Sequence, residues 1–123
     1  MRLVSLQKGP GTEEIAAAAD RVPLIDLGAE FDRAAGAFMD TAAVIKNLDL
    51  VIAADTAIGH LAGALGVPFW LALTSQAEWR WMIGRDDSPW YPTARLFRQD
   101  ETRAWNNVIA RVHAELRDFV QSR

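Results

Sequence analysis

Short apolar runs alternate with polar, helix-favouring segments along the chain. The apolar runs occupy residues 3–6, 22–27, 50–54, 68–73 and, more weakly, 95–98. Short runs of this kind, bounded by glycine, proline or aspartate, are typical of buried strands. Because they are too continuous for a sheet with one wetted face, we predict a parallel sheet covered by helices on both faces. The pattern thus indicates an α/β, Rossmann-like fold of about five strands.

Helical segments are predicted between the strands. They cover residues 13–20, residues 40–47 and a segment that opens at Thr56. Asp40 is a candidate N-cap, because Met39 before it and Val44 after it can form a hydrophobic staple. The third segment has a Gly-Val-Pro stop at residues 66–68.

The last predicted helix is amphipathic. Its apolar positions recur at helical spacing: Trp105, Val108, Ile109, Val112, Leu116, Phe119 and Val120. The opposite face carries Asn107, Arg111, Glu115 and Asp118. This period predicts a helix with one face packed on a core.

Composition and charge narrow the class of protein. The chain has 123 residues, half of them hydrophobic, which suits a single globular domain over residues 1–123. A net charge of −3, from 16 acidic and 13 basic residues without a dominant block, argues against nucleic-acid binding. With no cysteine and two histidines far apart, a disulfide framework is excluded and a zinc site is disfavoured.

No segment of the sequence has the pattern of a membrane span or a secretion signal. The run at residues 3–6 is too short for the apolar region of a signal peptide. The longest uncharged apolar run, residues 61–73, contains two glycines and a proline and is too short to cross a bilayer. We therefore expect a cytoplasmic protein.

The strongest candidate for chemistry is the junction at Asp55, Thr56 and Ala57, between an apolar run and a helix. In a parallel sheet this junction brings the carboxyl end of a strand to the amino end of a helix, where backbone N–H groups favour an anion such as phosphate. His60 lies one turn after Thr56 and shares its face of the helix. The alternative is that Thr56 only caps the helix and His60 only packs.

A second candidate is the loop that contains Lys8 and Gly9. A cation in a Gly-Pro-Gly loop directly after a strand can reach a diphosphate bound at a neighbouring strand, and Asp55 is a possible ion-pair partner for it. The alternative is an ordinary exposed lysine, since the Walker pattern is absent.

A third candidate is the tryptophan-rich segment 78–92. Trp79 is the best ligand candidate there, because an exposed indole can stack on a base or a sugar ring. Trp81 and Trp90 are expected to anchor the loop on its own core. Asp86 and Asp87, next to Arg85, suit a solvated turn better than a catalytic carboxylate pair.

Several of these motifs occur together in one order along nearly the whole chain. They are residues 5–11 (Ser-Leu-Gln-Lys-Gly-Pro-Gly), 40–43, 55–57, 60–66, 79–81, 87–92 and 95–99. In this order and spacing they resemble the carboxyl-terminal glycosyltransferase region of bacterial tetratricopeptide-repeat proteins. That region is related to family 9 heptosyltransferases and to O-GlcNAc transferases.

The resemblance implies the second Rossmann-like domain of a GT-B enzyme, which binds a nucleotide-diphosphate-sugar as substrate and needs no metal or other cofactor. Asp55, Thr56 and Ala57 would meet the diphosphate and sugar, Lys8 with Gly9 would neutralise phosphate charge, and His60 would support the site. The loop after residue 73 departs from the family pattern, which leaves the base contacts open.

The resemblance also implies parts that the chain lacks. Relatives carry an amino-terminal acceptor domain that supplies the catalytic base, and a strand and helix before the segment matching residues 3–7. We therefore expect a fragment or partial enzyme without turnover alone, whose partners are that domain or a repeat region. A noncatalytic binding or assembly module is the alternative. An unpaired strand edge beside residues 3–7 would favour a homodimer.

Overall fold

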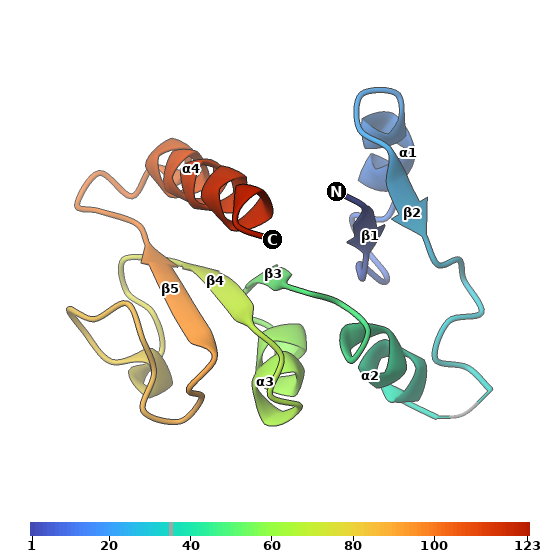
Figure 1. The fold of residues 1–123 in the computed structure, drawn as a ribbon, viewed down its shortest axis with the longest axis horizontal. Coiled ribbons are helices and arrows are strands. Elements are labelled where there is room, and N and C mark those ends of the chain that lie inside the picture. The colour runs from blue at the N-terminus through green and yellow to red at the C-terminus, as the bar shows by residue number, and fades with distance from the viewer. Residues whose placement is uncertain (35) are drawn as a thin grey trace. The chain divides into compact units, whose positions relative to one another are not determined.

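Strands and helices alternate in the computed structural model, which describes residues 1–34 and 36–123 (Figure 1). The strands are β1 (Leu3–Ser5), β2 (Leu24–Asp26), β3 (Val51–Ala54), β4 (Phe69–Leu73) and β5 (Ala94–Arg98). The α-helices are α1 (Glu13–Ala19), α2 (Met39–Ile45), α3 (Ala57–Ala64) and α4 (Trp105–Gln121), and a 3-10 turn, η1, spans Trp79–Trp81. The predicted α/β class is confirmed.

The strands form two parallel sheets. One has the order β1-β2 and the other the order β3-β4-β5. They belong to two compact units, Met1–Ala43 and Val44–Arg123. The five predicted strands are thus present, but they are divided between two hydrogen-bonded sheets. An apolar run identifies a strand without identifying its neighbours, because pairing depends on contacts between segments far apart in the chain.

The first unit is held by a polar network more than by an apolar core. No residue of α1 is buried, and the buried side chains among the described residues of this unit are those of Asp32 and Thr41. The Asp32 carboxylate accepts hydrogen bonds from the Thr41 backbone N–H, at 2.9 Å, and from the Thr41 hydroxyl. Asp40 in turn accepts the backbone N–H of Asp32 at 2.7 Å.

This network corrects the predicted start of α2. The helix begins at Met39, so Asp40 lies inside the first turn and is not the N-cap. Asp32, nine residues before Thr41, supplies the carboxylate that satisfies a first-turn amide. Sequence spacing missed this partner because capping groups are expected next to the helix that they cap.

The second unit covers both faces of its sheet. Phe69 and Leu71 lie against α3, whereas Trp70 and Phe97 pack with Val108 and Val112 of α4. Neighbouring residues of β4 point to opposite faces, so α3 and α4 lie on opposite sides of the three-stranded sheet (Figure 1). The prediction of helices on both faces is confirmed for this sheet.

Two glycines allow α3 to pack closely. A Cβ at Gly59 would lie 2.6 Å from Cδ2 of Leu71, and one at Gly63 would lie 2.5 Å from Cδ1 of Tyr91. The helix then ends in a Schellman motif, in which Gly66 has φ +73° and the Val67 N–H donates to the Ala62 carbonyl at 3.0 Å. Glycine is therefore required at the helix end by conformation and within the helix by space.

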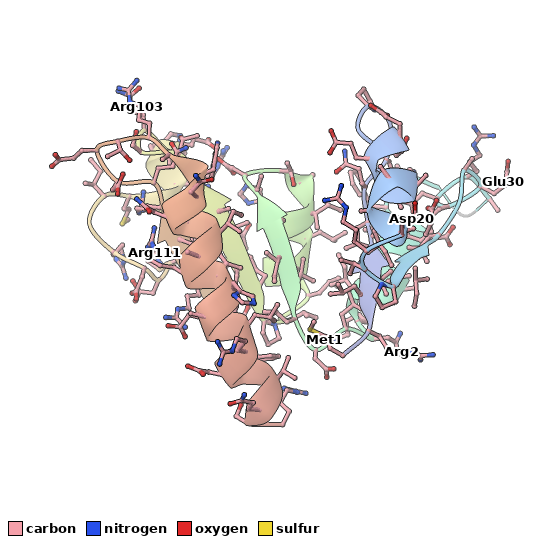
Figure 2. The ribbon with its side chains drawn as sticks, turned by 90° about the horizontal axis from the view of Figure 1, so that it is seen from above. Met1, Arg2, Asp20, Glu30, Arg103 and Arg111 are labelled. Atoms are coloured by element: carbon pink, nitrogen blue, oxygen red, sulfur yellow. The ribbon has the colours of Figure 1, made fainter. Side chains whose placement is uncertain are left out.

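The amphipathic pattern of α4 is confirmed over 17 residues, with Val108 and Val112 buried. Its polar flank also contacts the sheet, because Glu115 accepts a hydrogen bond from Arg95 of β5 at 2.7 Å. Arg111, labelled in Figure 2, donates to the carbonyl of Arg98 at the end of the same strand. Ile109, on the predicted apolar face, is 58% exposed.

Candidate functional site

The candidate site lies where β3 ends and α3 begins. Thr56 occupies the N-cap position with extended backbone (φ −136°, ψ 173°), but its side chain makes no capping hydrogen bond. Its hydroxyl lies 3.5 Å from the Ala54 carbonyl instead. The first amides of a helix have no partner within it. The amino end of α3, from Ala57, therefore keeps N–H donors for an outside acceptor.

Asp55 is held beside this helix end by Trp81. The Trp81 indole N–H donates to Oδ1 of Asp55 at 3.0 Å, and Trp81 itself is fully buried. Nε2 of His60 lies 4.0 Å from the same oxygen. The side chains of Asp55 and His60 each keep about a third of their surface exposed, at 32% and 31%. Trp81 thus holds Asp55 from the protein interior, while the Asp55 and His60 side chains stay accessible to solvent.

His60 lies between two aromatic rings. It stacks on Trp81, with ring centroids 5.1 Å apart and planes inclined by 28°, and it meets Tyr91 edge-on at 5.8 Å. Nδ1 of His60 is 3.1 Å from the Tyr91 hydroxyl. Both ring nitrogens of His60 thus face a defined neighbour.

The arrangement combines hydrogen-bond donors with one acceptor. The amide end of α3 suits an anion, whereas the Asp55 carboxylate repels anions and suits hydroxyl groups. His60 can donate or accept according to its protonation. Within residues 1–34 and 36–123, no cluster of three or more potential ligands for a metal is formed.

The tryptophans of segment 79–90 have different environments. Trp79 is 71% exposed, and its ring lies 5.2 Å from the guanidinium carbon of Arg80. Trp81 is buried, as expected of an anchor. The same expectation is wrong for Trp90, which is 56% exposed and donates its indole N–H to the Arg80 carbonyl at 3.1 Å on the surface of the loop. Trp79 is therefore the tryptophan of this segment with the most surface for a ligand.

The Asp86–Asp87 turn is solvated, as predicted. Both aspartates are exposed, and Arg85 donates to Asp87 at 2.6 Å. The hydrogen bond from Arg85 is the main reason that the pKa of Asp87 lies below its ordinary value. This geometry is that of a surface ion pair.

Lys8 and Gly9 belong to the first unit. The Lys8 ammonium donates to the Phe31 carbonyl at 3.0 Å and lies 3.6 Å from Oδ2 of Asp32. The structure thus gives this lysine Asp32 as its ion-pair partner, where the sequence suggested Asp55. About half of the Lys8 side chain, 51%, stays exposed. Gly9, with φ +72°, shapes the turn that follows.

Tyr91 and the hydrogen-bonding role of Trp81 were missed by sequence reasoning. Tyr91 lies 31 residues from His60, and Trp81 lies 26 residues from Asp55. A usable signal was present, because a buried tyrosine or tryptophan normally finds a partner for its polar atom. That signal predicts that a partner exists but does not identify it.

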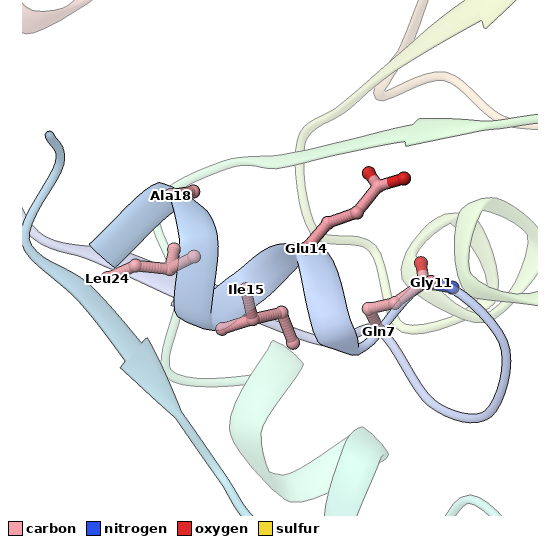
Figure 3. Close-up of a pocket in the computed structure, with 6 residues that line it drawn as sticks. All are labelled: Gln7, Gly11, Glu14, Ile15, Ala18 and Leu24. Atoms are coloured by element: carbon pink, nitrogen blue, oxygen red, sulfur yellow. The ribbon is translucent and has the colours of Figure 1, made fainter. Parts of the chain in front are cut away.

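The first unit has a hollow of about 350 Å³ between α1 and β2 (Figure 3). It is lined by Gln7, Gly11, Glu14, Ile15, Ala18 and Leu24. None of the residues predicted to bind a ligand lines it.

Comparison with known proteins identifies the family. Residues 37–108, more than half of the chain, match glycosyltransferase family 9 (heptosyltransferase). The chain therefore belongs to glycosyltransferase family 9. The matched stretch includes Asp55, Thr56, Ala57, His60 and Trp79, whereas Lys8 and Gly9 lie outside it.

One curated relative is Protein FlbA of Caulobacter vibrioides, which is 36% identical over 126 residues. The alignment covers 97% of this chain and 20% of FlbA, so the chain spans about a fifth of that relative's length. No solved structure matches the chain. None of the helices in the described residues is both long and apolar enough to span a membrane.

Proposed function

We propose that this chain binds the nucleotide-diphosphate-sugar donor of a GT-B glycosyltransferase. The observation that carries the proposal is the uncapped amino end of α3 beside the Asp55–His60 pair, within the stretch that matches the family. A helix amino end stabilises a diphosphate both before and after the sugar leaves, without a metal.

The charges of the side chains decide which groups in the proposed site are assigned to the diphosphate and which to the sugar. The diphosphate is assigned to the Thr56 hydroxyl and the Ala57 backbone N–H, since the Thr56 N–H already donates to the Ala54 carbonyl at 2.8 Å and the Asp55 carboxylate would repel an anion. Asp55 and His60 are assigned to sugar hydroxyls, because a carboxylate is a strong hydroxyl acceptor. Trp79 is assigned to stacking on the base or the sugar. As a separate proposal, which rests on the family resemblance alone, Lys8 with Gly9 of the first unit neutralises phosphate charge.

Titration calorimetry with uridine, guanosine and adenosine diphosphates tests the proposal. Thr56→Ala and Lys8→Ala are each expected to weaken binding by about 1.5 to 3 kcal/mol, the contribution of one charge-assisted hydrogen bond. Thr12→Ala is the matched control for Thr56, since Thr12 also precedes a helix without capping it. Lys46→Ala is the control for Lys8.

Binding of none of the three diphosphates would contradict the donor proposal. It would favour the other candidate, a noncatalytic binding or assembly module that retains this half of the fold. Equal losses in the target and control variants would contradict the residue assignment and leave the donor proposal standing.

The wider setting of the chain is part of the same proposal. We assign acceptor binding and the catalytic base to an amino-terminal GT-B domain, so that this chain alone has no turnover. The proposal also includes an association with tetratricopeptide repeats, a relationship to O-GlcNAc transferases and a cytoplasmic location. Mixing the chain with candidate acceptor domains and assaying sugar transfer tests whether turnover depends on them.

Self-association is also proposed. Among the described residues, β1 and β3 each pair with one strand only, and Ile52 in β3 is 44% exposed. An open edge with apolar side chains favours pairing with a second chain. Light scattering at micromolar concentration is expected to give a dimer, and a monomer at every concentration would contradict this part.

A further inference from the structure

We propose that Trp81 and Tyr91 are positioning residues that hold Asp55 and His60 in place for the ligand. This inference rests on the proposed function for its ligand, but the contacts that carry it lie wholly within the second unit. Trp81 forms a hydrogen bond with Asp55 through its indole N–H, and Tyr91 forms one with His60 through its hydroxyl. The distances are 3.0 Å from Trp81 Nε1 to Asp55 Oδ1 and 3.1 Å from the Tyr91 hydroxyl to His60 Nδ1.

These two hydrogen bonds determine which donor and acceptor atoms of Asp55 and His60 stay available to a ligand. A neutral imidazole carries a proton on one nitrogen only. The Asp55 carboxylate beside Nε2 favours the proton there, so Nδ1 accepts the hydroxyl of Tyr91. The Trp81 indole occupies one carboxylate oxygen of Asp55 and leaves acceptor capacity on the other. The pair therefore offers an N–H donor and a carboxylate acceptor side by side.

The support is built into the fold of the second unit. Gly63 has no side chain where a Cβ would meet the Tyr91 ring, so that ring can lie against α3. Tyr91 also packs edge-on against Phe69 of β4, with centroids 5.7 Å apart.

Trp81 is fixed from β5. Arg98 donates to the Trp81 carbonyl and, from Nε, to the Arg85 carbonyl at 3.2 Å. Burial lowers the pKa of Arg98, in keeping with its position under this segment. Because Asp55 and His60 are already held in place by these contacts, less conformational entropy is lost when a ligand binds to them.

The experiment uses variants that remove one polar atom and keep an aromatic ring. Trp81→Phe removes the indole N–H that reaches Asp55, and Tyr91→Phe removes the hydroxyl that reaches His60. Trp90→Phe is the matched control, since Trp90 also donates its indole N–H within this segment, to the Arg80 carbonyl. Thermal unfolding of all three shows whether each variant folds.

The first readout needs no ligand. The imidazole nitrogen resonances of His60 are recorded by NMR, with His113 on the exposed side of α4 as an internal reference. Tyr91→Phe and Trp81→Phe are expected to shift the His60 resonances and leave those of His113 in place. Trp90→Phe is expected to shift neither. His60 resonances that stay unchanged in both target variants would overturn the proposal.

The second readout is affinity for uridine, guanosine and adenosine diphosphates in a double-mutant cycle. Tyr91→Phe alone is expected to weaken binding by about 2- to 10-fold, the effect of one neutral hydrogen bond. In the His60→Ala background it is expected to cause no further loss, because a residue that acts through His60 has nothing left to position. The same loss in both backgrounds would overturn the proposal.

The two readouts separate failure of this inference from failure of the proposed function. If none of the three diphosphates binds the unchanged chain, the donor function fails, and the NMR readout still decides the positioning contacts. If a diphosphate binds and both readouts show no coupling, the donor function stands and the positioning roles are wrong.

Discussion

Two carboxylates of this chain, Asp32 and Asp55, are both held by neighbouring side chains, but they differ in how much of their acceptor capacity is used. Asp32 is bonded at both oxygens by Thr41, has Lys8 nearby, and keeps 3% of its side chain exposed. Asp55 is bonded at one oxygen by Trp81 and keeps 32% exposed.

This difference separates a structural carboxylate from one that can serve a ligand. A buried carboxylate must have its acceptors satisfied by the protein, because an unsatisfied buried charge is costly. A carboxylate that is fixed at one oxygen and open at the other can complete its bonding with a ligand. The positions of Asp32 and Asp55 in the sequence do not reveal this difference.

The largest expected effect is on stability, at Thr41. Thr41→Val keeps the shape of this buried side chain but removes the hydroxyl that bonds Asp32, so the carboxylate loses a donor. We expect a loss of about 1 to 3 kcal/mol in the free energy of unfolding, measured in urea. Thr56→Val, at an exposed position, is expected to change it by less than about 0.5 kcal/mol. Equal stability of the two variants would remove the contrast between the two regions.

At Asp55 the expected effect is on binding. Asp55→Asn keeps an oxygen for the Trp81 indole but removes the charge offered to a ligand hydroxyl. Affinity for a uridine-, guanosine- or adenosine-diphosphate sugar is expected to fall about tenfold, or ~1.4 kcal/mol, with less loss for the bare diphosphate. Calorimetry of both ligands checks this. A greater loss for the bare diphosphate would show that Asp55 does not face the sugar.

The pH dependence of stability sharpens the comparison at Asp32. Burial raises the pKa of Asp32, but the Thr41 hydroxyl, the backbone N–H groups of Thr41 and Asp40 and the charge of Lys8 together lower it below its ordinary value. A carboxyl whose pKa is lower in the folded state stabilises the fold above its unfolded pKa and loses that contribution as pH falls through the folded value. Asp32→Asn is therefore expected to be less stable than the unchanged chain at neutral pH.

The stability difference between these two proteins is expected to close in acid, below the ordinary range of aspartate. Urea unfolding of both proteins across this range measures it. A difference that stays constant with pH would show that the ionised form of Asp32 is not what stabilises α2.

The smallest effect is expected at an exposed ion pair. Arg95 and Glu115 meet at 2.7 Å with side chains 41% and 39% exposed, and the hydrogen bond from Arg95 lowers the pKa of Glu115. Arg95→Met keeps most of the packing of the side-chain stem and is expected to cost about 0.2 to 1 kcal/mol, because solvent screens such pairs. A loss in urea unfolding as large as that of Thr41→Val would contradict this ranking of the two networks.

The sequence by itself determined the local elements. Apolar runs predicted all five strands to within a few residues, and the 3.6-residue period predicted α4. The Gly-Val-Pro stop at residues 66–68 predicted the end of α3. These features depend on neighbours along the chain, so a pattern over several residues is sufficient to predict them.

Only the tertiary structure decided which distant residues meet. The division of the strands into two sheets, the capping of α2 by Asp32, and the contacts of Trp81 with Asp55 and of Tyr91 with His60 all join segments separated by many residues. The sequence shows that such polar groups need partners, because unpaired buried groups are costly. It does not identify those partners, because their distances are set by the packing of helices and strands against one another.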